Sequence, residues 1–168
     1  MDTMRSAKNS QILIAALGIA MLVAGCARPA SGSPRATGPQ GPTITVSARP
    51  LAHVGEVLVD SHGYALYMFV PDAQKQVTCA GLCAATWPPL KVPADATLAA
   101  GPGVRSALLG SDADPAGGRV VTYDGWPLYT YSGDVSPGQI TGQGIDLNGG
   151  DWFLMRPTGQ PLTQGLLP

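Results

Sequence analysis

Three kinds of side chain in this sequence could carry chemistry: a cysteine pair, a few soft metal ligands and several aspartates. Cys79 and Cys83 are separated by three residues, a spacing that could serve a dithiol redox site or part of a metal site. It is not the C-x-x-C spacing of thioredoxin-like proteins, and no βαβ pattern surrounds it. On spacing alone, a disulfide, a redox or metal site and two reduced thiols all stay open.

The soft metal ligands are few and scattered. His53 and His62 are the only histidines, and Met68 and Met155 are the only methionines beyond the N-terminal region. With the cysteines they could supply ligands for copper or haem. His62 stands in a predicted turn, where a polar residue is expected in any case. We therefore expect no metal site and no cofactor.

The acidic residues point to turns more than to catalysis. Glu56 is the sole glutamate, so paired-carboxylate chemistry would depend on aspartates, and no G-x-S-x-G is present. Asp72 and Asp134 each follow a predicted strand in a turn composition. A carboxylate there accepts hydrogen bonds from backbone amides or a tyrosine hydroxyl. We assign no catalytic residue, and the sequence favours a protein that is not an enzyme.

An internal repeat positions these aspartates. Residues 59–72 align without a gap with residues 121–134, at a constant offset of 62. Both copies fit the pattern Y-x-[FWY]-x-x-D, formed by Tyr67, Phe69 and Asp72 in the first copy and by Tyr129, Tyr131 and Asp134 in the second. Two copies indicate a duplication, because a solenoid needs at least three.

Each copy has the pattern of a β-hairpin. Residues 57–60 and 64–70 flank His62-Gly63, and residues 120–123 and 126–131 flank Asp124-Gly125. A two-residue turn ending in glycine is a strong hairpin signal. The period of two places Tyr67 and Phe69 on one face and Leu66 and Met68 on the other. One more strand is predicted at 152–155, a loop with one helical turn at 94–110, and a long loop at 135–150.

Composition supports an all-β fold. The chain has 168 residues, 22 glycines and 16 prolines, which disfavours helical bundles and coiled coils. Only 12% of residues are charged and the formal net charge is −1, so no basic face for nucleic acid is expected. Aromatic side chains cluster in the repeats. They could form either the core of a small domain or a groove for sugar rings.

The N-terminus has the features of an export signal. Arg5 and Lys8 precede an apolar run that is too short for a comfortable membrane span. The run ends in Leu-Val-Ala-Gly-Cys, which looks like a bacterial lipobox, so Cys26 is the expected lipidation site. Two or three acyl chains at Cys26 would anchor the protein stably. Cys79 and Cys83 then remain as an even pair in an exported protein, most simply a disulfide.

The duplicated motif resembles that of a bacterial family of predicted lipoproteins described as a secreted repeat of unknown function. The segment C-x-G-x-C-x-x-x-W-P-P between the copies, residues 79–89, is also similar to that family. The resemblance covers about residues 54–158. It implies export, lipidation and a duplicated β unit, and it implies no substrate.

These observations predict a small antiparallel all-β domain built from two hairpin-containing repeats. We expect a lipoprotein signal peptide at 1–25, a lipidated cysteine and disordered tether at 26–48, and the domain at 49–168, with repeats at about 54–92 and 116–158. The expected protein is a lipid-anchored envelope module for binding or structural work. It would face outward on the bacterial cell membrane, with an envelope polymer or another envelope protein as partner. The alternative is an extracytoplasmic redox, metal or haem protein that uses the Cys79/Cys83 region.

Overall fold

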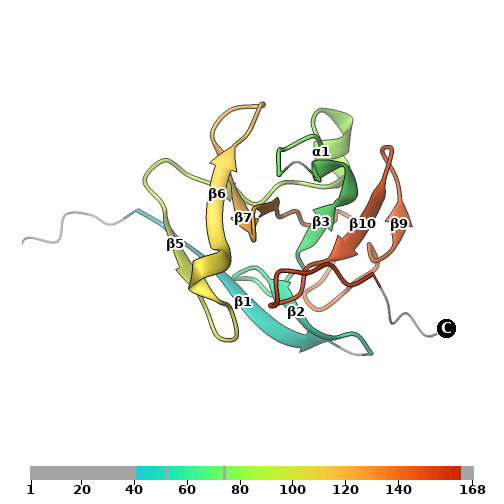
Figure 1. The fold of residues 1–168 in the computed structure, drawn as a ribbon, viewed down its shortest axis with the longest axis horizontal. Helices are drawn as coiled ribbons and strands as arrows, with labels where there is room; N and C mark the ends of the chain where they lie inside the picture. Colours follow the sequence, from blue (N-terminus) through green and yellow to red (C-terminus); the bar gives the residue numbers. More distant parts are fainter. Residues whose placement is uncertain (1–40, 52, 74, 164–168) are drawn as a thin grey trace, which may run out of the picture. The chain divides into compact units, whose positions relative to one another are not determined.

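The computed structural model describes residues 41–163 except 52 and 74. These residues belong to one structural unit, residues 37–168. Strands predominate, and helix is confined to short pieces (Figure 1). The elements are β1 (Thr43–Leu51), β2 (Gly55–Val59), β3 (Tyr67–Phe69), η1 (Val70–Asp72), α1 (Leu82–Thr86), β4 (Lys91–Val92), β5 (Thr97–Ala100), η2 (Ser106–Leu108), β6 (Leu109–Ala113), β7 (Arg119–Tyr123), β8 (Trp126–Pro127), β9 (Ile145–Asp146) and β10 (Asp151–Leu154).

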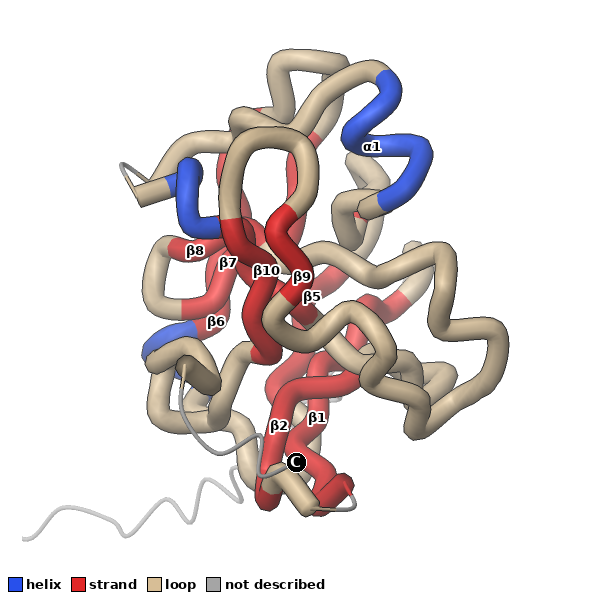
Figure 2. The backbone as a smooth tube through the Cα atoms, turned by 90° about the vertical axis from the view of Figure 1, so that its right-hand side faces the viewer, coloured by secondary structure: helices blue, strands red, loops and turns tan. Residues whose placement is uncertain are grey.

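The strands form three small sheets, with the orders β2-β1-β5, β3-β10-β9 and β4-β7-β6, and β8 pairs with β7. All strand pairs are antiparallel except β1–β5, which is parallel. Helix α1 lies at the opposite end of the domain from the β1–β2 hairpin (Figure 2). The all-β fold class with two repeats is therefore confirmed.

The two repeats exchange their last segments. Each repeat has a hairpin (β1–β2 or β6–β7), a third strand and a last segment, which ends in β4 or contains β10. The term third strand here means the extended residues 64–69, which contain β3, or 126–131, which contain β8. In the first repeat, Leu90 donates its N–H to the carbonyl of Leu128 and accepts from Val121, both at 2.8 Å. In the second, Met155 donates its N–H to the carbonyl of Leu66 at 2.9 Å and accepts from Leu58 at 2.8 Å, the equivalent two bonds to the first repeat. Neither repeat has all its strand partners within its own sequence.

The third strands meet at the centre of the domain. Tyr67 and Tyr129 each donate a backbone N–H to the carbonyl of the other, at 2.8 and 2.9 Å. Because these residues occupy the same position in the two repeats, an approximate twofold axis passes between them. Every interaction that joins one repeat to the other near this axis is therefore expected to occur twice.

Alternate residues of the third strands face two separate cores, as the period of two predicts. Tyr67 and Phe69 lie in one core, while Leu66 and Met68 lie in the other. The first core is rich in aromatic rings and also contains the buried residues Val54, Val57, Ala65, Cys79, Trp87, Tyr129, Trp152, Leu154 and Leu162. The second core is mainly aliphatic. One face of the third strands therefore packs against aromatic side chains, and the other face packs against aliphatic ones.

The two hairpin turns differ by one residue although the sequences align without a gap. Asp124 and Gly125 form the expected two-residue turn, with φ of 51° and 76°, between the paired residues Tyr123 and Trp126. In the first repeat, the Asp60 N–H bonds to the Tyr64 carbonyl at 2.9 Å, so three residues form the loop. The expected two-residue turn at His62-Gly63 is therefore wrong. The strand before it is shifted by one residue relative to the second copy.

The folded part begins earlier than residue 49. Strand β1 starts at Thr43, inside the segment expected to be a tether up to residue 48. Pairing with β2 on one side and β5 on the other explains why a segment of small and polar residues is ordered here. The expected signal peptide and the lipidation site Cys26 lie outside the described residues.

Two strands occur where loops are expected. Strand β5 lies in the expected loop 94–110, and η2 provides the helical turn expected in the same segment. Strand β9 lies in the expected loop 135–150 and forms a hairpin with β10 across Asn148 and Gly149, whose φ angles are 61° and 89°. Within the described ranges, no helix is long and apolar enough to cross a membrane.

Candidate functional site

The duplicated motif forms two hydrogen-bonded pairs that cross between the repeats. The Tyr67 hydroxyl donates to Asp134 Oδ2, and the Tyr129 hydroxyl donates to Asp72 Oδ2, both at 2.7 Å. Both tyrosines and Asp72 are fully buried, and Asp134 is 5% exposed. A carboxylate after each strand accepts from a tyrosine hydroxyl, as the sequence suggests. The tyrosine comes from the other copy.

A threonine completes each pair. Asp72 Oδ1 accepts from the backbone N–H of Thr78 at 2.8 Å and from its hydroxyl at 2.5 Å. Asp134 Oδ1 accepts the same two bonds from Thr141, at 2.8 and 2.6 Å. Sequence reasoning missed these threonines because they follow the aspartates by six and seven residues, so a gapless alignment does not superpose them. All four carboxylate oxygens of the motif are thus satisfied from within the domain.

Burial governs the protonation of these groups. Burial, with the neighbouring carboxylate, raises the pKa of Tyr67 and of Tyr129 far above the usual tyrosine range. Burial also raises the pKa of Asp72, and this effect outweighs the opposing hydrogen bonds from Thr78 and Tyr129. The hydroxyls therefore remain protonated donors at neutral pH. This suits a structural hydrogen bond more than proton transfer to a substrate.

Four aromatic rings stack between the two motif pairs. The central rings, Trp87 and Trp152, lie 4.0 Å apart with an interplanar angle of 1°. Phe69 covers the outer face of Trp152, and Tyr131 covers the outer face of Trp87, each at 4.2 Å. Both tryptophans are fully buried. The open possibility of a sugar-binding groove on these rings is wrong, because protein rings occupy both faces of each tryptophan.

The cysteine pair lies beside this stack. Cys79 and Cys83 form a disulfide with Cα atoms 5.3 Å apart, which confirms the expected bridge. Helix α1 begins inside the bridged loop, and the Trp87 N–H donates to the Cys83 carbonyl at 2.8 Å at its end. The second repeat contacts the same helix, since the Ser132 N–H donates to the Thr86 carbonyl at 2.9 Å. The bridge therefore fixes the turn that delivers Trp87 to the stack.

The other candidate ligands are not brought together. His53 and His62 are exposed, whereas Met68 and Met155 are buried in the aliphatic core. His62 Nδ1 lies 3.6 Å from Asp60 Oδ2 at the first hairpin turn. Across residues 41–163, apart from the two gaps, no three His, Cys, Asp or Glu side chains group in a way that could hold a metal ion.

The comparisons with known proteins agree with the duplicated architecture. No curated protein and no solved structure matches the chain significantly. A family model described as a secreted repeat of unknown function matches residues 52–91 and 110–155, one match for each copy of the motif. These matches include both tyrosine–aspartate motifs, the disulfide and both stacked tryptophans. The chain therefore belongs to this family of secreted repeats.

Proposed function

We propose that this protein is a lipid-anchored module on the extracytoplasmic face of the bacterial cell membrane, where it serves binding or structural work without catalysis. One observation carries the proposal: the polar groups of the family motif bond to other groups inside the domain and are not presented at its surface. Both motif tyrosines and both motif aspartates are buried and bonded to one another and to threonines. A substrate could reach these groups only if the two repeats separated.

The N-terminal sequence supports the anchor. The apolar run that ends at Cys26 fits lipidation, and the 14 residues 27–40 separate Cys26 from the first described residue. Such a segment spans at most about 50 Å when fully extended. The domain would then remain close to the membrane surface, within reach of an envelope polymer or another envelope protein. The low charge of the chain argues against nucleic acid as the partner.

The anchor is tested by replacing its attachment atom. Cys26→Ala, expressed in the native envelope, should lose labelling by radioactive palmitate and should leave the membrane fraction. Cys79→Ser/Cys83→Ser is the matched control, because it removes the other cysteines, and it should retain both properties. Wild-type membrane retention and labelling of Cys26→Ala would contradict lipid anchoring.

The disulfide favours a second candidate function, that of an extracytoplasmic redox protein. Cys83 is only partly buried, so an external thiolate could attack its sulfur, form a mixed disulfide and release Cys79 as the thiolate. A second external thiol would then complete the reduction. A structural bridge should resist a glutathione buffer, whereas a redox-active one should equilibrate with it. Counting free thiols after this incubation distinguishes the two functions, because thiols that appear reversibly would support the redox role.

A further inference from the structure

The turn between β9 and β10 contains an Asn-Gly dipeptide, Asn148-Gly149. The chain has only one other asparagine, Asn9, which lies in the expected signal peptide. Asn148 and Gly149 are both exposed, and the hairpin projects at the edge of the domain (Figure 1). Because glycine has no Cβ, no side chain shields the Gly149 backbone nitrogen from the side-chain amide carbon of Asn148. An amide carbon and a nucleophilic nitrogen that can reach it are therefore neighbours here.

Neither reacting group is engaged elsewhere in the domain. Within the part of the chain that the structure describes, the Gly149 N–H donates to no acceptor and the Asn148 side chain makes no hydrogen bond. A Cβ added to Gly149 would meet no atom within 4 Å, so the space around the dipeptide is open. The turn can therefore change conformation at these two residues without breaking a bond that they make.

The strands that flank this turn hold it weakly. The first residue pair below the turn is Asp146 opposite Asp151, and both aspartates are exposed. Like charges directly opposite each other destabilise a strand pair, and among the described residues no cation lies within 4.0 Å of either carboxylate. The turn is closed by one backbone hydrogen bond, from the Leu147 N–H to the Gly150 carbonyl at 3.0 Å. The tip of the hairpin should therefore open while the rest of the domain stays folded.

We propose that Asn148-Gly149 is a site of spontaneous deamidation, and that the isoaspartate formed there opens the β9–β10 hairpin irreversibly. The Gly149 nitrogen loses its proton to hydroxide and attacks the Asn148 Cγ. A new C–N bond forms, the bond from Cγ to the side-chain nitrogen breaks, and that nitrogen leaves as ammonia with a proton from water. Water then opens the cyclic imide at either carbonyl and gives aspartate or isoaspartate. One water is consumed and one ammonia is released, and no oxidant or reductant takes part.

The isoaspartate product does not fit the turn. It routes the main chain through the former side chain, which adds one carbon to the backbone between Leu147 and Gly149. The Leu147 carbonyl, which accepts from Trp152 Nε1 at 3.1 Å, would then shift away from the indole. A third carboxylate would also join those of Asp146 and Asp151. The modification therefore reaches the stacked tryptophans from an exposed turn.

The other two-residue turn, Asp124-Gly125, provides an internal comparison. Both of its residues are partly buried, and the Asp124 N–H donates to the Leu108 carbonyl at 2.8 Å. The Lys75 side chain packs so closely against Gly125 that a Cβ there would clash with it. Opening this turn therefore breaks contacts that the β9–β10 turn does not have.

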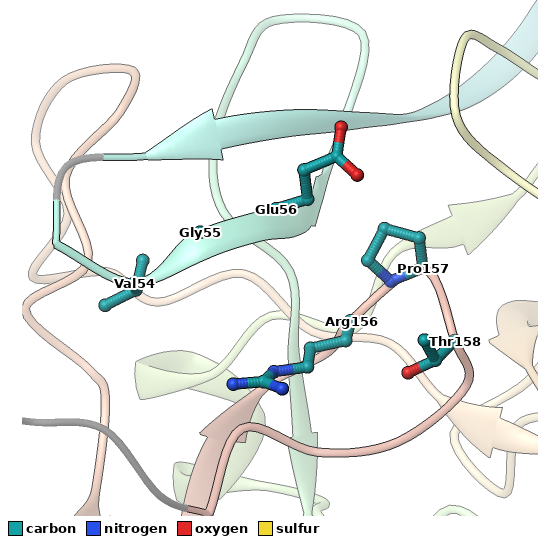
Figure 3. A pocket seen from close by; sticks show the side chains of 6 residues that line it. All are labelled: Val54, Gly55, Glu56, Arg156, Pro157 and Thr158. Carbon is teal, nitrogen blue, oxygen red and sulfur yellow. The ribbon is translucent and has the colours of Figure 1, made fainter.

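The turn that follows β10 covers Asp124 from a further side. A Cβ added to Gly159 would lie 3.0 Å from the Asp124 Cβ. Figure 3 shows three residues of this turn, Arg156, Pro157 and Thr158, as one wall of a hollow of about 310 Å³ opposite the start of β2. The turn is fixed in place, because the Tyr123 hydroxyl donates to the Pro157 carbonyl at 2.8 Å. The same dipeptide should therefore react more slowly at 124–125 than at 148–149.

The test places the same dipeptide in both turns of one molecule. Asp124→Asn does so, and asparagine tolerates the positive φ of this position. The full exported chain is incubated in detergent at mildly alkaline pH, and peptide mapping by mass spectrometry follows the exchange of NH for O at each turn. Modification at 148 should be about tenfold or more faster than at 124, and its rate should rise with pH. An equal unfolding midpoint before incubation would show that the variant folds as the wild type does.

A second variant separates the modification from its consequence. Asn148→Gln should remain unmodified, because its longer side chain would have to close a larger ring. Enzymatic methylation specific for isoaspartate should label the incubated wild type and not this variant. The near-ultraviolet circular dichroism of the packed tryptophans should change with time in the wild type and stay constant in Asn148→Gln.

Three results would overturn the proposal. The first is an unmodified Asn148 under conditions in which a synthetic peptide of residues 144–153 deamidates. The second is equal modification rates at the two turns of Asp124→Asn, because the weak hold on the β9–β10 turn would then have no effect. The third is a fully modified protein whose near-ultraviolet circular dichroism is unchanged, because the hairpin would then tolerate isoaspartate.

Discussion

The two repeats place a tryptophan at the same point by different local means. Trp152 lies on β10, which pairs with β9, and its Nε1 donates to the Leu147 carbonyl at 3.1 Å. Trp87 follows α1 and the disulfide, and its Nε1 is buried without a hydrogen-bond partner among the described residues. One repeat holds its ring by strand pairing and a hydrogen bond, whereas the other uses a covalent bridge.

The contacts of the two tryptophans at the centre of the domain are the same in both repeats, whereas the segments that support the tryptophans differ. Each tryptophan meets a tyrosine of the third strands edge-on, Trp87 with Tyr67 at 5.4 Å and Trp152 with Tyr129 at 5.1 Å. These geometries recur because the two tryptophans, which stack on each other, are related by the approximate twofold axis. The segments outside the stack face solvent on one side, so a helix with a disulfide and a hairpin are both acceptable supports.

Cutting the chain should have the largest effect, because each repeat needs the last segment of the other. A cut between the exposed residues Pro102 and Gly103 separates the repeats. Each fragment alone should lack cooperative unfolding, and mixing the two should restore it together with the near-ultraviolet circular dichroism of the packed tryptophans. Cooperative unfolding of either fragment alone would show that the exchange is not required.

Sequence patterns with local causes predict the structure well here. The period of two assigns both faces of β3, because alternation is built into an extended backbone. Asp124-Gly125 forms its two-residue turn because both positions need positive φ. The same signal, Asn148-Gly149, marks the β9–β10 hairpin and could have located it within the expected loop.

Other features depend on partners distant in sequence, which no local pattern reports. Residues 43–46 of β1 pair with β5, which lies 54 residues further along the chain, whereas residues 47–51 pair with the neighbouring β2. The last segments are exchanged because the backbones of Leu90 and Met155 form hydrogen bonds with the opposite repeat. The motif aspartates could be assigned to turns, but the origin of the bonded tyrosine depends on how the two copies pack.

After the chain cut, substitutions of the two tryptophans should lower the free energy of unfolding the most, and the two losses should differ. Trp152→Ala should lower the free energy of unfolding by about 3 to 5 kcal/mol, as for large-to-small core changes. Trp87→Ala should cost less, because it also removes a buried N–H that has no partner. Urea unfolding followed by circular dichroism measures both. Trp87→Phe and Trp152→Phe sharpen the test, since a smaller penalty at Trp152 would contradict the role of its hydrogen bond.

The tyrosine–aspartate pairs should be closer to equivalent than the tryptophans are. Tyr67→Phe and Tyr129→Phe each leave a buried carboxylate oxygen without its donor, and each should cost about 2 to 3 kcal/mol. Tyr67→Phe should lie at the upper end of this range, because the Tyr67 hydroxyl also accepts from the Gly142 N–H at 3.3 Å. Tyr123→Phe is the matched control and should cost about 1 kcal/mol, because its hydroxyl bonds two neutral backbone groups, the Pro157 carbonyl and the Arg105 N–H, and no carboxylate. Chemical denaturation of the three variants provides the measurement. A difference between Tyr67→Phe and Tyr129→Phe as large as that between the tryptophans would break the symmetry at the centre.

The disulfide should contribute less than the ring it supports. The bridge closes a loop of only five residues, for which chain entropy gives about 2 kcal/mol. Cys79→Ser/Cys83→Ser should therefore destabilise the protein less than Trp87→Ala does. Intact mass with and without reductant checks that the bridge was present. A larger loss in the cysteine variant would mean that the bridge does more than fix the local turn.

The smallest effect concerns the pH dependence of stability. Burial raises the pKa of Asp72 above its ordinary value of 3.8, so between these two values the folded state binds more protons than the unfolded state. The free energy of unfolding therefore falls as the pH rises through this window, and Asp72→Asn should lose that dependence. Asp114 provides the opposite control. Burial acts to raise its pKa, but hydrogen bonds from Lys91 and Ala116 outweigh burial and lower it.

Asp114 contributes to the free energy of unfolding above its ordinary pKa of 3.8, and this contribution is lost as the pH falls through its lowered pKa in the folded state. Urea midpoints from about pH 3 to about pH 7 should therefore show that the wild type loses stability relative to Asp72→Asn as the pH rises. Relative to Asp114→Asn, the wild type should gain stability in the acidic part of that range. Slopes of the same sign for the two variants would mean that the bonds from Thr78 and Tyr129 outweigh burial at Asp72. The motif carboxylate would then stabilise the fold as an ordinary ionised acceptor.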